Sequence, residues 1–536
     1  MTDMEIGHDA SGSGGAVAAG AAPSVAAGLE LLAAGGNAAD AAVATILALA
    51  VTDYGLFAIG GEIPWLIRDA HSGRVTVLSG VGRAPLSAEA IAWYWENEIP
   101  DMGDYRATPV PGAIHLCMTA LELFGTRSFA EAVAPALALL DAGELEWHAP
   151  LAATLRKLVE RERDTSGSRE AKLQAACERF YRGDIADDLV ERYREVGSFL
   201  THEDLAAHVT TVEEPVSVSY RGWTVHKCPT WTQGPVLCQT LRLLEGLDLP
   251  AMAHASADHI HALTEAMKLA YADRDTYYGD PDFAEVPMAE LLADEYTELR
   301  RALIDMERAS AEQRPGDPLN LRALLARGDA EANGVRTPIS DTTTCVAADR
   351  WGNVVACTPS CNLVGNQPDP RTGVTQGNRL RCLNTTPGHP NRIEPGKRPR
   401  VTLTPTLATR EDGAAIAISV AGGDIQDQTA LNALLNHLEF GMMPAQAVTA
   451  PRFHTQHLEN SFDSDPDRAR AFIAPASLIV NATVAEDVQA VLARRGHELT
   501  VAQGAIGMPV MLTVNEAGAM HAAGDPQAGR HDGALE

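Results

Sequence analysis

The sequence predicts an α+β protein in which helices and strands form separate blocks that pack in layers. Two observations support this class. The stretch from Pro109 to about Arg194 is mainly helical, whereas short apolar strands gather around residues 343–358 and 415–420. A leucine-rich helix, Ala430–Leu438, follows the second group of strands. Helices and strands are therefore segregated rather than strictly alternating, which indicates a layered sandwich.

The first predicted elements are alanine-rich helices. Ser24 can cap a helix whose apolar residues continue to Leu32, and the pair Gly35–Gly36 ends it. Asn37 can then cap a second helix, from Ala38 to about Val51. Because alanine side chains are small, these helices are expected to pack closely.

Strand signals follow the two helices. Trp65–Arg68 and Val75–Leu78 flank a Ser-Gly turn, and Tyr220–Cys228 alternates like a strand. The segment Ala309–Pro338 is polar and weakly periodic, which predicts an exposed connector. Directly after it, residues 343–349 and 354–358 predict two strands around a turn.

Length and charge narrow the possible roles. A chain of 536 residues exceeds what a single core usually serves, so several lobes or one interleaved unit are expected. It carries 71 acidic against 42 basic residues, a formal net charge of −29. Such an excess repels phosphate backbones, so nucleic acid is not an expected partner. Solubility is a sufficient reason for the acidity.

No segment indicates a membrane or an export route. Residues 1–15 lack the basic start and apolar core of a secretory signal. The longest apolar run, Ala41–Val51, is shorter than the roughly 20 residues that span a bilayer. The eight cysteines show neither metal-type nor paired spacing, so reduced thiols are expected. These observations predict a cytoplasmic protein.

The stretch Ser340-Asp341-Thr342-Thr343-Thr344-Cys345 holds a run of hydroxyls where the polar connector meets a buried strand. A threonine hydroxyl is a weak nucleophile unless a base removes its proton. Cutting the peptide bond before Thr342 would free its own amino group to act as that base. The motif alone leaves a second reading open, since threonines simply suit a strand.

Further motifs follow in a fixed order along nearly the whole chain. They are Ala26-Ala27-Gly28-Leu29, Gly35-Gly36-Asn37-Ala38-Ala39-Asp40, Gly60-Gly61, Pro109-Val110-Pro111-Gly112, Phe180-Tyr181-Arg182-Gly183, Leu200-Thr201-His202-Glu203-Asp204-Leu205, Thr232-Gln233-Gly234, Ala272-Asp273-Arg274-Asp275, Asp341-Thr342-Thr343, Gly396-Lys397-Arg398-Pro399, Gly422-Gly423 and Ala450-Pro451-Arg452-Phe453-His454. Each is weak alone, but the ordered set resembles the gamma-glutamyltranspeptidase family of N-terminal nucleophile hydrolases.

The resemblance implies a fold and a maturation step. The expected fold is a four-layer αββα sandwich of the N-terminal nucleophile hydrolase type. Cleavage between Asp341 and Thr342 would give a large subunit, 1–341, with a helical lobe and part of the sandwich. The small subunit, 342–536, would begin with the nucleophile, complete the same sandwich and stay associated with the large one.

The resemblance also assigns roles to residues that match the family's motifs. Thr342 falls on the nucleophile and Thr343 on the threonine after it. Ser360 falls on a hydroxyl that hydrogen-bonds the nucleophile, and Asn362 on a substrate-facing asparagine. Gly422 and Gly423 match the pair whose amides form the oxyanion hole, and glycine suits that role because a main chain without Cβ can approach the substrate carbonyl.

Several positions depart from the family's pattern. The arginine that holds the glutamyl α-carboxylate in the transpeptidases falls on Val81, and Arg83 lies two residues further on the same face of the strand. The serine pair that binds this carboxylate falls on Val401 and Thr402, so one hydroxyl is lost. The acid that binds the glutamyl ammonium falls on Cys382. A buried ammonium without a counter-charge is costly, so a γ-glutamyl donor is poorly served.

Arg379 is a new charge in the pocket-lining segment, where the transpeptidases have a neutral amide. Arginine suits bidentate capture of a carboxylate, although Arg379 and Arg381 could also be solvated surface charges. The Gly-Arg-Ala-Pro and Asn-Arg segments resemble the amidohydrolase branch of the family, which includes oxamate amidohydrolase. That branch implies a substrate that carries a carboxylate and no α-ammonium.

The predicted function is therefore an autoprocessing amidohydrolase for a small carboxylate-bearing acyl amide. The substrate-binding candidates are Asn362, Arg379, Thr402, Arg83 and Thr343. The alternatives are a γ-glutamyl hydrolase or transferase for glutathione-like donors, a β-lactam side-chain acylase, and a catalytically silent homologue that never processes. No cofactor and no metal are expected. The predicted partners are a small-molecule amide and the protein's own second fragment, and the processed pair could form a homo-oligomer.

Overall fold

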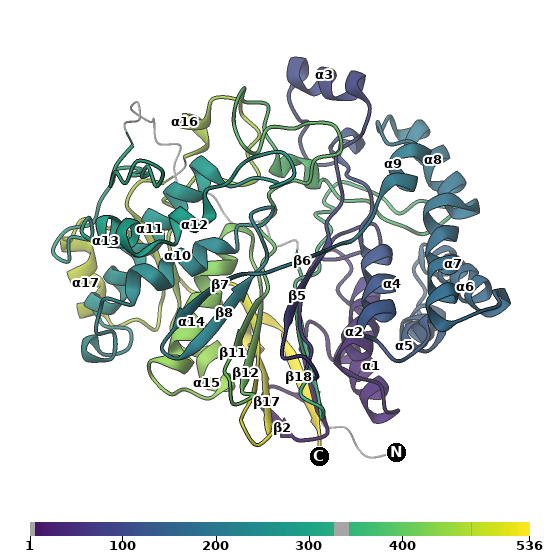
Figure 1. Ribbon diagram of the computed structural model, residues 1–536, viewed down its shortest axis with the longest axis horizontal. Coiled ribbons are helices and arrows are strands. Elements are labelled where there is room, and N and C mark those ends of the chain that lie inside the picture. Colours follow the sequence, from purple (N-terminus) through teal and green to yellow (C-terminus); the bar gives the residue numbers. More distant parts are fainter. Residues whose placement is uncertain (1–5, 326–341, 473) are drawn as a thin grey trace.

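The computed structural model describes residues 6–325, 342–472 and 474–536. Two large sheets lie face to face at its centre, and helices cover the outer side of each (Figure 1). The predicted four-layer αββα sandwich is thus confirmed. Within the described residues, no helix is long and apolar enough to cross a membrane.

All neighbouring strands in the two large sheets are antiparallel. In spatial order the first sheet contains β1 (Ile6–Gly7), β18 (His531–Leu535), β3 (Gly15–Ala19), β9 (Cys345–Asp349), β10 (Val354–Cys357), β4 (Ile63–Arg68), β5 (Val75–Gly80) and β6 (Thr211–Glu213). The second contains β2 (Ala10–Gly12), β17 (Met520–Gly524), β16 (Met508–Val514), β12 (Ala415–Ala421), β11 (Thr406–Thr409), β8 (Trp223–Lys227) and β7 (Val216–Tyr220). A small third sheet contains β13 (Phe453–His454), β14 (Ser477–Asn481) and β15 (Glu498–Ala502).

The helices fall into two groups (Figure 1). On the side of the first sheet lie α1 (Ala22–Ala33), α2 (Ala38–Thr52), α4 (Ala113–Phe124), α5 (Phe129–Ala142), α6 (His148–Asp164), α7 (Arg169–Arg182), α8 (Asp184–Val196) and α9 (His202–Ala207). On the side of the second lie α10 (Pro235–Leu244), α11 (Ala257–Tyr277), α12 (Met288–Leu291), α13 (Asp294–Arg301), α14 (Gln426–Leu438), α15 (Pro444–Thr449) and α17 (Glu486–Arg494). The helices α3 (Ala88–Asn97) and α16 (Arg468–Ala471) lie at the top of the view in Figure 1.

Along each strand, successive side chains point in turn into two different buried cores, because side chains in a strand repeat every two residues. In β4, Trp65 and Ile67 contact the core under α1, α2 and α4, whereas Leu66 contacts the core between the sheets. In β12, Ile416 and Ile418 belong to the core under α10, α11 and α14. Because both faces of these strands are covered, they read as continuous apolar runs in the sequence.

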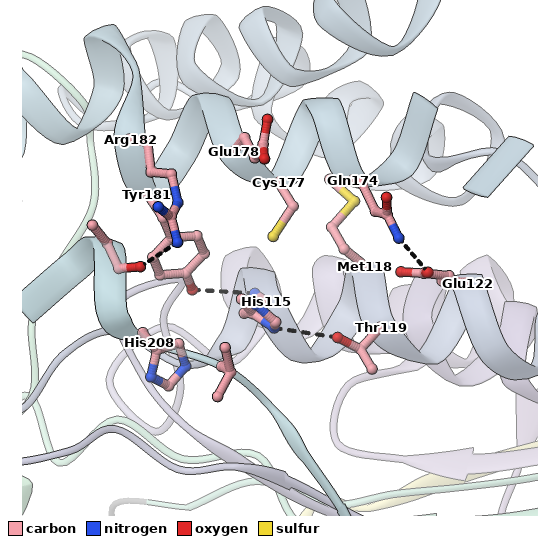
Figure 2. A pocket seen from close by; sticks show the side chains of 12 residues that line it. His115, Met118, Thr119, Glu122, Gln174, Cys177, Glu178, Tyr181, Arg182 and His208 are labelled. Atoms are coloured by element: carbon pink, nitrogen blue, oxygen red, sulfur yellow. Dashed lines mark hydrogen bonds between the residues drawn. The ribbon is translucent and has the colours of Figure 1, made fainter. Parts of the chain in front are cut away.

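Between α4 and α7 there is a hollow of about 270 Å³, which is lined in part by His115, Cys177, Tyr181 and His208 (Figure 2). Burial lowers the pKa of His115 to about 4, so this imidazole is neutral near pH 7. None of the residues predicted for catalysis lines this hollow.

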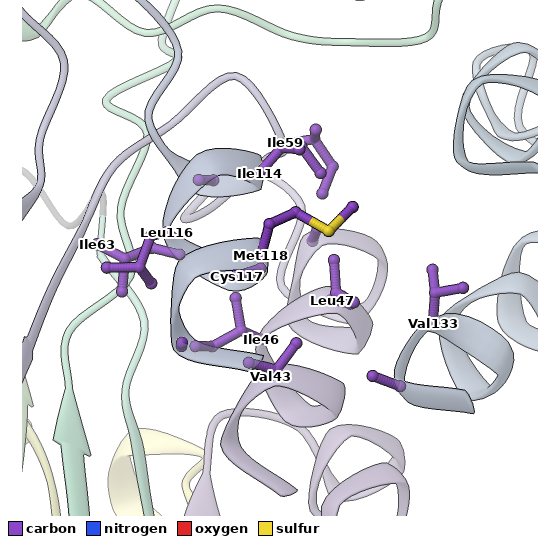
Figure 3. Packing of buried hydrophobic residues seen from close by; sticks show 14 of the residues in the cluster. Val43, Ile46, Leu47, Ile59, Ile63, Ile114, Leu116, Cys117, Met118 and Val133 are labelled. Carbon is purple, nitrogen blue, oxygen red and sulfur yellow. The ribbon is translucent and has the colours of Figure 1, made fainter. Parts of the chain in front are cut away.

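Helix α2 is at the centre of the first helical layer. Its side chains Val43, Ile46 and Leu47 pack toward Ile114 and Cys117 of α4 (Figure 3). The alanines of α2 bring α1 and α2 together over most of their length, as their small size predicts.

The start of α2 is fixed by a predicted cap and an additional carboxylate. The Asn37 side chain accepts hydrogen bonds from the N–H groups of Ala39 and Asp40, at 3.0 and 3.1 Å, as expected for a cap. Asp40 accepts a bond from the Asn37 N–H at 2.9 Å and completes a capping box. The buried Asp40 carboxylate also accepts from the N–H groups of Thr126 and Arg127. It therefore joins α2 to the segment before α5.

Two predicted elements are wrong in detail. Ser24 does not cap the first helix, because α1 begins at Ala22 with Ala21 as its N-cap. Pro23, whose fixed φ suits a first turn, lies inside that turn. The Ser24 hydroxyl instead lies 2.6 Å from that of Thr52 at the end of α2. The predicted strand Tyr220–Cys228 is divided by a tight turn at residues 221–222, where both φ angles are positive, and forms the hairpin of β7 and β8.

The segments before and after position 342 interleave in the first sheet. Strand β3 lies between β18 and β9, which both come from the C-terminal part of the chain. Of the predicted connector, residues 309–325 are described, whereas residues 326–341, with Asp341, lie outside the described residues. The division into subunits 1–341 and 342–536 stays a prediction.

We predict that Asp40→Ala lowers the free energy of unfolding by about 2–4 kcal/mol, because it removes the Asp40 half of the capping box and leaves the N–H groups of Thr126 and Arg127 without their carboxylate acceptor. The measurement is chemical or thermal denaturation of the purified protein. Thr126→Val is the matched control, since it removes one hydroxyl donor to Asp40 but keeps the carboxylate. Equal losses in the two variants would contradict the assignment of this role to Asp40.

Candidate active site

Thr342 lies three residues before the start of β9 in the first sheet and is completely buried. It pairs with Ser360 as an isolated antiparallel bridge, and the neighbouring Thr343 N–H donates to the Pro359 carbonyl at 2.9 Å. The Thr342 hydroxyl donates to the Ser360 hydroxyl oxygen at 3.2 Å. The two residues that the sequence assigns to nucleophile and supporting hydroxyl are therefore in contact.

Ser360 is held in turn by the segment after the Gly60–Gly61 pair. The Glu62 N–H donates to the Ser360 carbonyl at 2.9 Å, and the Ser360 N–H donates to the Glu62 carbonyl at 3.0 Å. A Cβ on Gly61 would lie 2.2 Å from the Ser360 carbonyl oxygen, so only glycine fits. This close approach explains the motif.

Arg379 is fully buried at the start of a short 3-10 helix, η3 (Arg379–Cys382). Its Nε donates to a Glu62 carboxylate oxygen at 2.6 Å, and its Nη2 donates to the Ser360 hydroxyl oxygen at 2.5 Å. Its Nη1 lies 3.9 Å from the Cys382 sulfur. Arg381 is also buried, at 9 % exposure, so neither arginine is a solvated surface charge. The sequence analysis did not single out Glu62, whose signal is an acid between the Gly60–Gly61 pair and the apolar strand β4.

The Gly422–Gly423 pair follows β12 and opens the 3-10 helix η4 (Gly423–Ile425). The φ angles are +147° and +63°, values that favour glycine. Among the described residues, no hydrogen-bond acceptor is recorded for either amide N–H. A Cβ on Gly423 would lie 3.3 Å from the Phe462 ring, and the Arg379 guanidinium carbon lies 5.6 Å from the centre of that ring. Phe462 therefore connects the glycine pair to the Arg379 cluster.

Asn362 and Thr402 are both completely buried. Within the described part of the chain, the side-chain amide of Asn362 and the hydroxyl of Thr402 have no hydrogen-bond partner. The Asn362 backbone has a positive φ of 49° and is fixed by two hydrogen bonds from Asn378, at 2.9 and 3.0 Å, to its carbonyl. Buried polar groups without partners are costly, so both groups are suited to bind a polar ligand.

Thr343 has a different environment from the other predicted binding residues. Its hydroxyl donates to the Asp53 carboxylate at the end of α2. Arg530 Nη1 donates to this carboxylate at 3.1 Å and to the Thr343 oxygen at 3.0 Å. The hydroxyl is thereby engaged by an ion pair, which anchors the residue next to the nucleophile.

Arg83 is not brought into this cluster. Its Nη1 donates to the Gly396 carbonyl at 3.1 Å, and its Nη2 lies 3.6 Å from the Asp282 carboxylate. Val81 is buried in the core between the sheets. The site therefore gathers Thr342, Ser360 and Arg379, whereas the contacts of Arg83 are with other segments.

One group of side chains in the described ranges has the spacing of metal ligands, His261, Glu265 and His497. The two imidazoles hydrogen-bond each other at 2.8 Å, and Glu265 forms ion pairs with Lys268 and Arg314. Burial lowers the pKa of His497 to about 3, with a further contribution from nearby Lys268. Two cations already balance the carboxylate, so the group is a buried hydrogen-bond network.

A threonine at the start of a central strand, a supporting hydroxyl and a glycine pair are arranged here within an αββα sandwich. This arrangement defines the class of N-terminal nucleophile hydrolases. The sequence profile named Gamma-glutamyltranspeptidase matches residues 24–145 and 138–534. The chain belongs to the gamma-glutamyltranspeptidase family and is an amidohydrolase.

Individual members of this family are similar to the chain over most of its length. The glutathione hydrolase proenzyme of Bacillus subtilis (strain 168) is 30 % identical over 468 residues, which is 81 % of this chain and 79 % of the relative. The acylase ACY 1 proenzyme of Pseudomonas sp. (strain SE83) is 32 % identical over 486 residues, 83 % of each chain. The crystal structure of cephalosporin acylase from Bacillus halodurans superposes with a TM-score of 0.79 at 26 % identity and covers 100 % of this chain and 97 % of that one. The names of the first two relatives describe them as proenzymes.

We predict that Gly423→Ala lowers kcat by on the order of 10²–10³ and leaves the fold largely intact, because the altered backbone would turn away an amide that the family resemblance assigns to the oxyanion hole. Steady-state kinetics on processed enzyme measures this. Gly441→Ala is the matched control, since Gly441 has a similar φ of +66° and open space around its Cβ position. A Gly423→Ala enzyme with wild-type turnover would place the oxyanion hole elsewhere.

Proposed function

We propose that this protein is an autoprocessing amidohydrolase that cleaves the amide bond of a small carboxylate-bearing acyl group through a threonyl acyl-enzyme. One observation carries the proposal. Arg379 is fully buried and donates to the Ser360 hydroxyl, which itself accepts the hydroxyl hydrogen of Thr342. A fixed cation thus lies two hydrogen bonds from the nucleophile, where it can bind an anionic acyl group.

Maturation follows from the position of Thr342. Its Oγ attacks the carbonyl carbon of Asp341, the hydroxyl proton passes to the Thr342 nitrogen as the peptide C–N bond breaks, and the acyl group is transferred to oxygen as an ester. Water then hydrolyses the ester, which frees the Thr342 amine and the Asp341 carboxylate. The Ser360 hydroxyl, 3.2 Å from the attacking oxygen, is placed to orient it for this step.

Turnover uses the same threonine. The free amine accepts the hydroxyl proton, and Oγ attacks the substrate's amide carbonyl. The N–H groups of Gly422 and Gly423 stabilise the oxyanion. The leaving amine takes a proton as its C–N bond breaks, and water cleaves the acyl-enzyme to release the carboxylic acid. Asn362 and Thr402 supply neutral polar contacts to the acyl group.

The local charges support an acyl group without an α-ammonium. Cys382 stands where the transpeptidases have an ammonium-binding acid, and the Arg379 guanidinium lies 3.9 Å from its sulfur. A substrate ammonium would therefore meet a cation at this position. The β-lactam side-chain acylase alternative is supported by the acylase relative and by the structural similarity to cephalosporin acylase.

A different observation bears on the glutathione-type alternative, which needs an acid to bind the substrate ammonium. The Glu62 carboxylate lies in the same cluster and is an acid to which the family resemblance assigned no role. It is paired with Arg379, so an ammonium would have to compete with the guanidinium for it. This competition makes the anionic amide the better supported substrate.

We predict that purified protein consists of two fragments that meet at Asp341/Thr342, and that N-terminal sequencing of the smaller begins Thr-Thr-Thr-Cys. Thr342→Ala should remain one chain without amidase activity, since it has neither the hydroxyl nor the freed nucleophile. A denaturing gel with mass spectrometry measures both. Intact wild-type chain with full activity would contradict the mechanism and leave the silent or non-processing alternative.

We predict that Arg379→Ala lowers kcat/KM for an anionic acyl amide by about 10- to 100-fold, the range expected for a charge-assisted hydrogen bond. Arg379→Lys should recover part of the loss, because an ammonium cannot form the bidentate fork. The same variants are assayed on the neutral methyl ester of the substrate, which corrects for general damage. Equal losses on both amides, or a γ-glutamyl anilide as the best wild-type donor, would favour the glutathione-type reading.

A further inference from the structure

Glu62 connects the backbone and the charges of the site. Its main chain exchanges two hydrogen bonds with Ser360, and its carboxylate binds Arg379 Nε at 2.6 Å. Arg379 then reaches the Ser360 hydroxyl at 2.5 Å. Glu62 is 1 % exposed and Arg379 is 0 % exposed, so solvent hardly screens their interaction.

We propose that Glu62 is a positioning and specificity-determining residue for the reaction proposed above, on which this inference rests. Its carboxylate fixes the guanidinium so that Nη2 stays on Ser360, and it sets the net charge that an acyl group meets beside the nucleophile. In the wild-type pair this charge is balanced. The enzyme then selects a carboxylate through the directed hydrogen bonds of Arg379 and not through the attraction of an unpaired positive charge.

The backbone geometry explains why Glu62 can both position Arg379 and set the charge beside Thr342. Gly61 approaches the Ser360 carbonyl so closely that the segment cannot shift without moving Ser360. The main chain of Glu62 is therefore in a fixed register with Ser360, and its side chain is delivered to Arg379 from that position. A change in the carboxylate alters the charge and leaves the backbone pairing in place.

The experiment uses three variants of the full chain, Glu62→Gln, Arg379→Gln and the double variant, which change the local charge by +1, −1 and zero. Each processed enzyme is assayed on succinyl p-nitroanilide, its methyl ester and γ-glutamyl p-nitroanilide. Glu62→Gln should raise the ratio of kcat/KM for the anionic over the ester substrate by about tenfold, mainly through KM, as expected for one unbalanced charge in a partly screened site. Arg379→Gln should raise the relative rate on the γ-glutamyl compound.

The double variant and a matched control test whether charge is the cause. In the double variant, Glu62→Gln with Arg379→Gln, the ratios of kcat/KM among the three substrates should return toward those of an uncharged pocket. A larger fraction of this variant than of either single variant should be cleaved between Asp341 and Thr342. Asp525→Asn is the control, because it removes the carboxylate of another buried pair, with Arg452, outside the nucleophile cluster. It should lower the thermal midpoint without altering the ratios.

The outcomes separate this inference from the proposed function. If Glu62→Gln lowers all three substrates equally, or if the double variant processes no better than the singles, Glu62 has only a structural role and the inference is overturned. If instead the wild type prefers the γ-glutamyl compound while the ratios still shift with charge as described, the proposed substrate class fails and the assignment of Glu62 stands.

Discussion

The site depends on the buried ion pair between Glu62 and Arg379. The main chain of Glu62 pairs with that of Ser360, whose hydroxyl contacts Thr342. Arg379 loses its hydration completely, and the Glu62 carboxylate at 2.6 Å compensates for part of that loss. The same guanidinium binds the hydroxyl that contacts Thr342. Removing either partner would leave an uncompensated charge beside the reacting oxygen.

The two sheets bring the remaining parts to this pair. The ends of β10 and β12 lie next to each other, since the hydroxyls of Thr358 and Ser419 are 3.0 Å apart across the sheets. Ser360 follows the first strand, and Gly422 follows the second. Thr342 with Ser360 and the Gly422–Gly423 pair therefore come from opposite sheets. Their spacing is fixed by the tightly packed core between the sheets.

Individual residues show which contacts of the candidate site could be predicted from the sequence. The contact between Thr342 and Ser360 and the burial of Gly422–Gly423 agree with positions assigned by resemblance. The resemblance also suggested Arg83 as a substitute carboxylate-binding residue, but in the structure it contacts Gly396 and Asp282. An offset of two residues preserves the face of a strand only while the strand continues, and β5 ends at Gly80.

The sequence by itself determined the layered α+β class, the helix pair around Asn37 and the ordered motifs that carry the family resemblance, on which the prediction of Thr342 as nucleophile rests. These are local or ordered features, since caps, turns and periodicity act over a few residues. Only the tertiary structure decided which charges meet. Glu62 and Arg379 are separated by more than half the chain, and no periodicity or spacing links them. Their pairing follows from the antiparallel register that joins residue 62 to residue 360, a long-range contact that only folding creates.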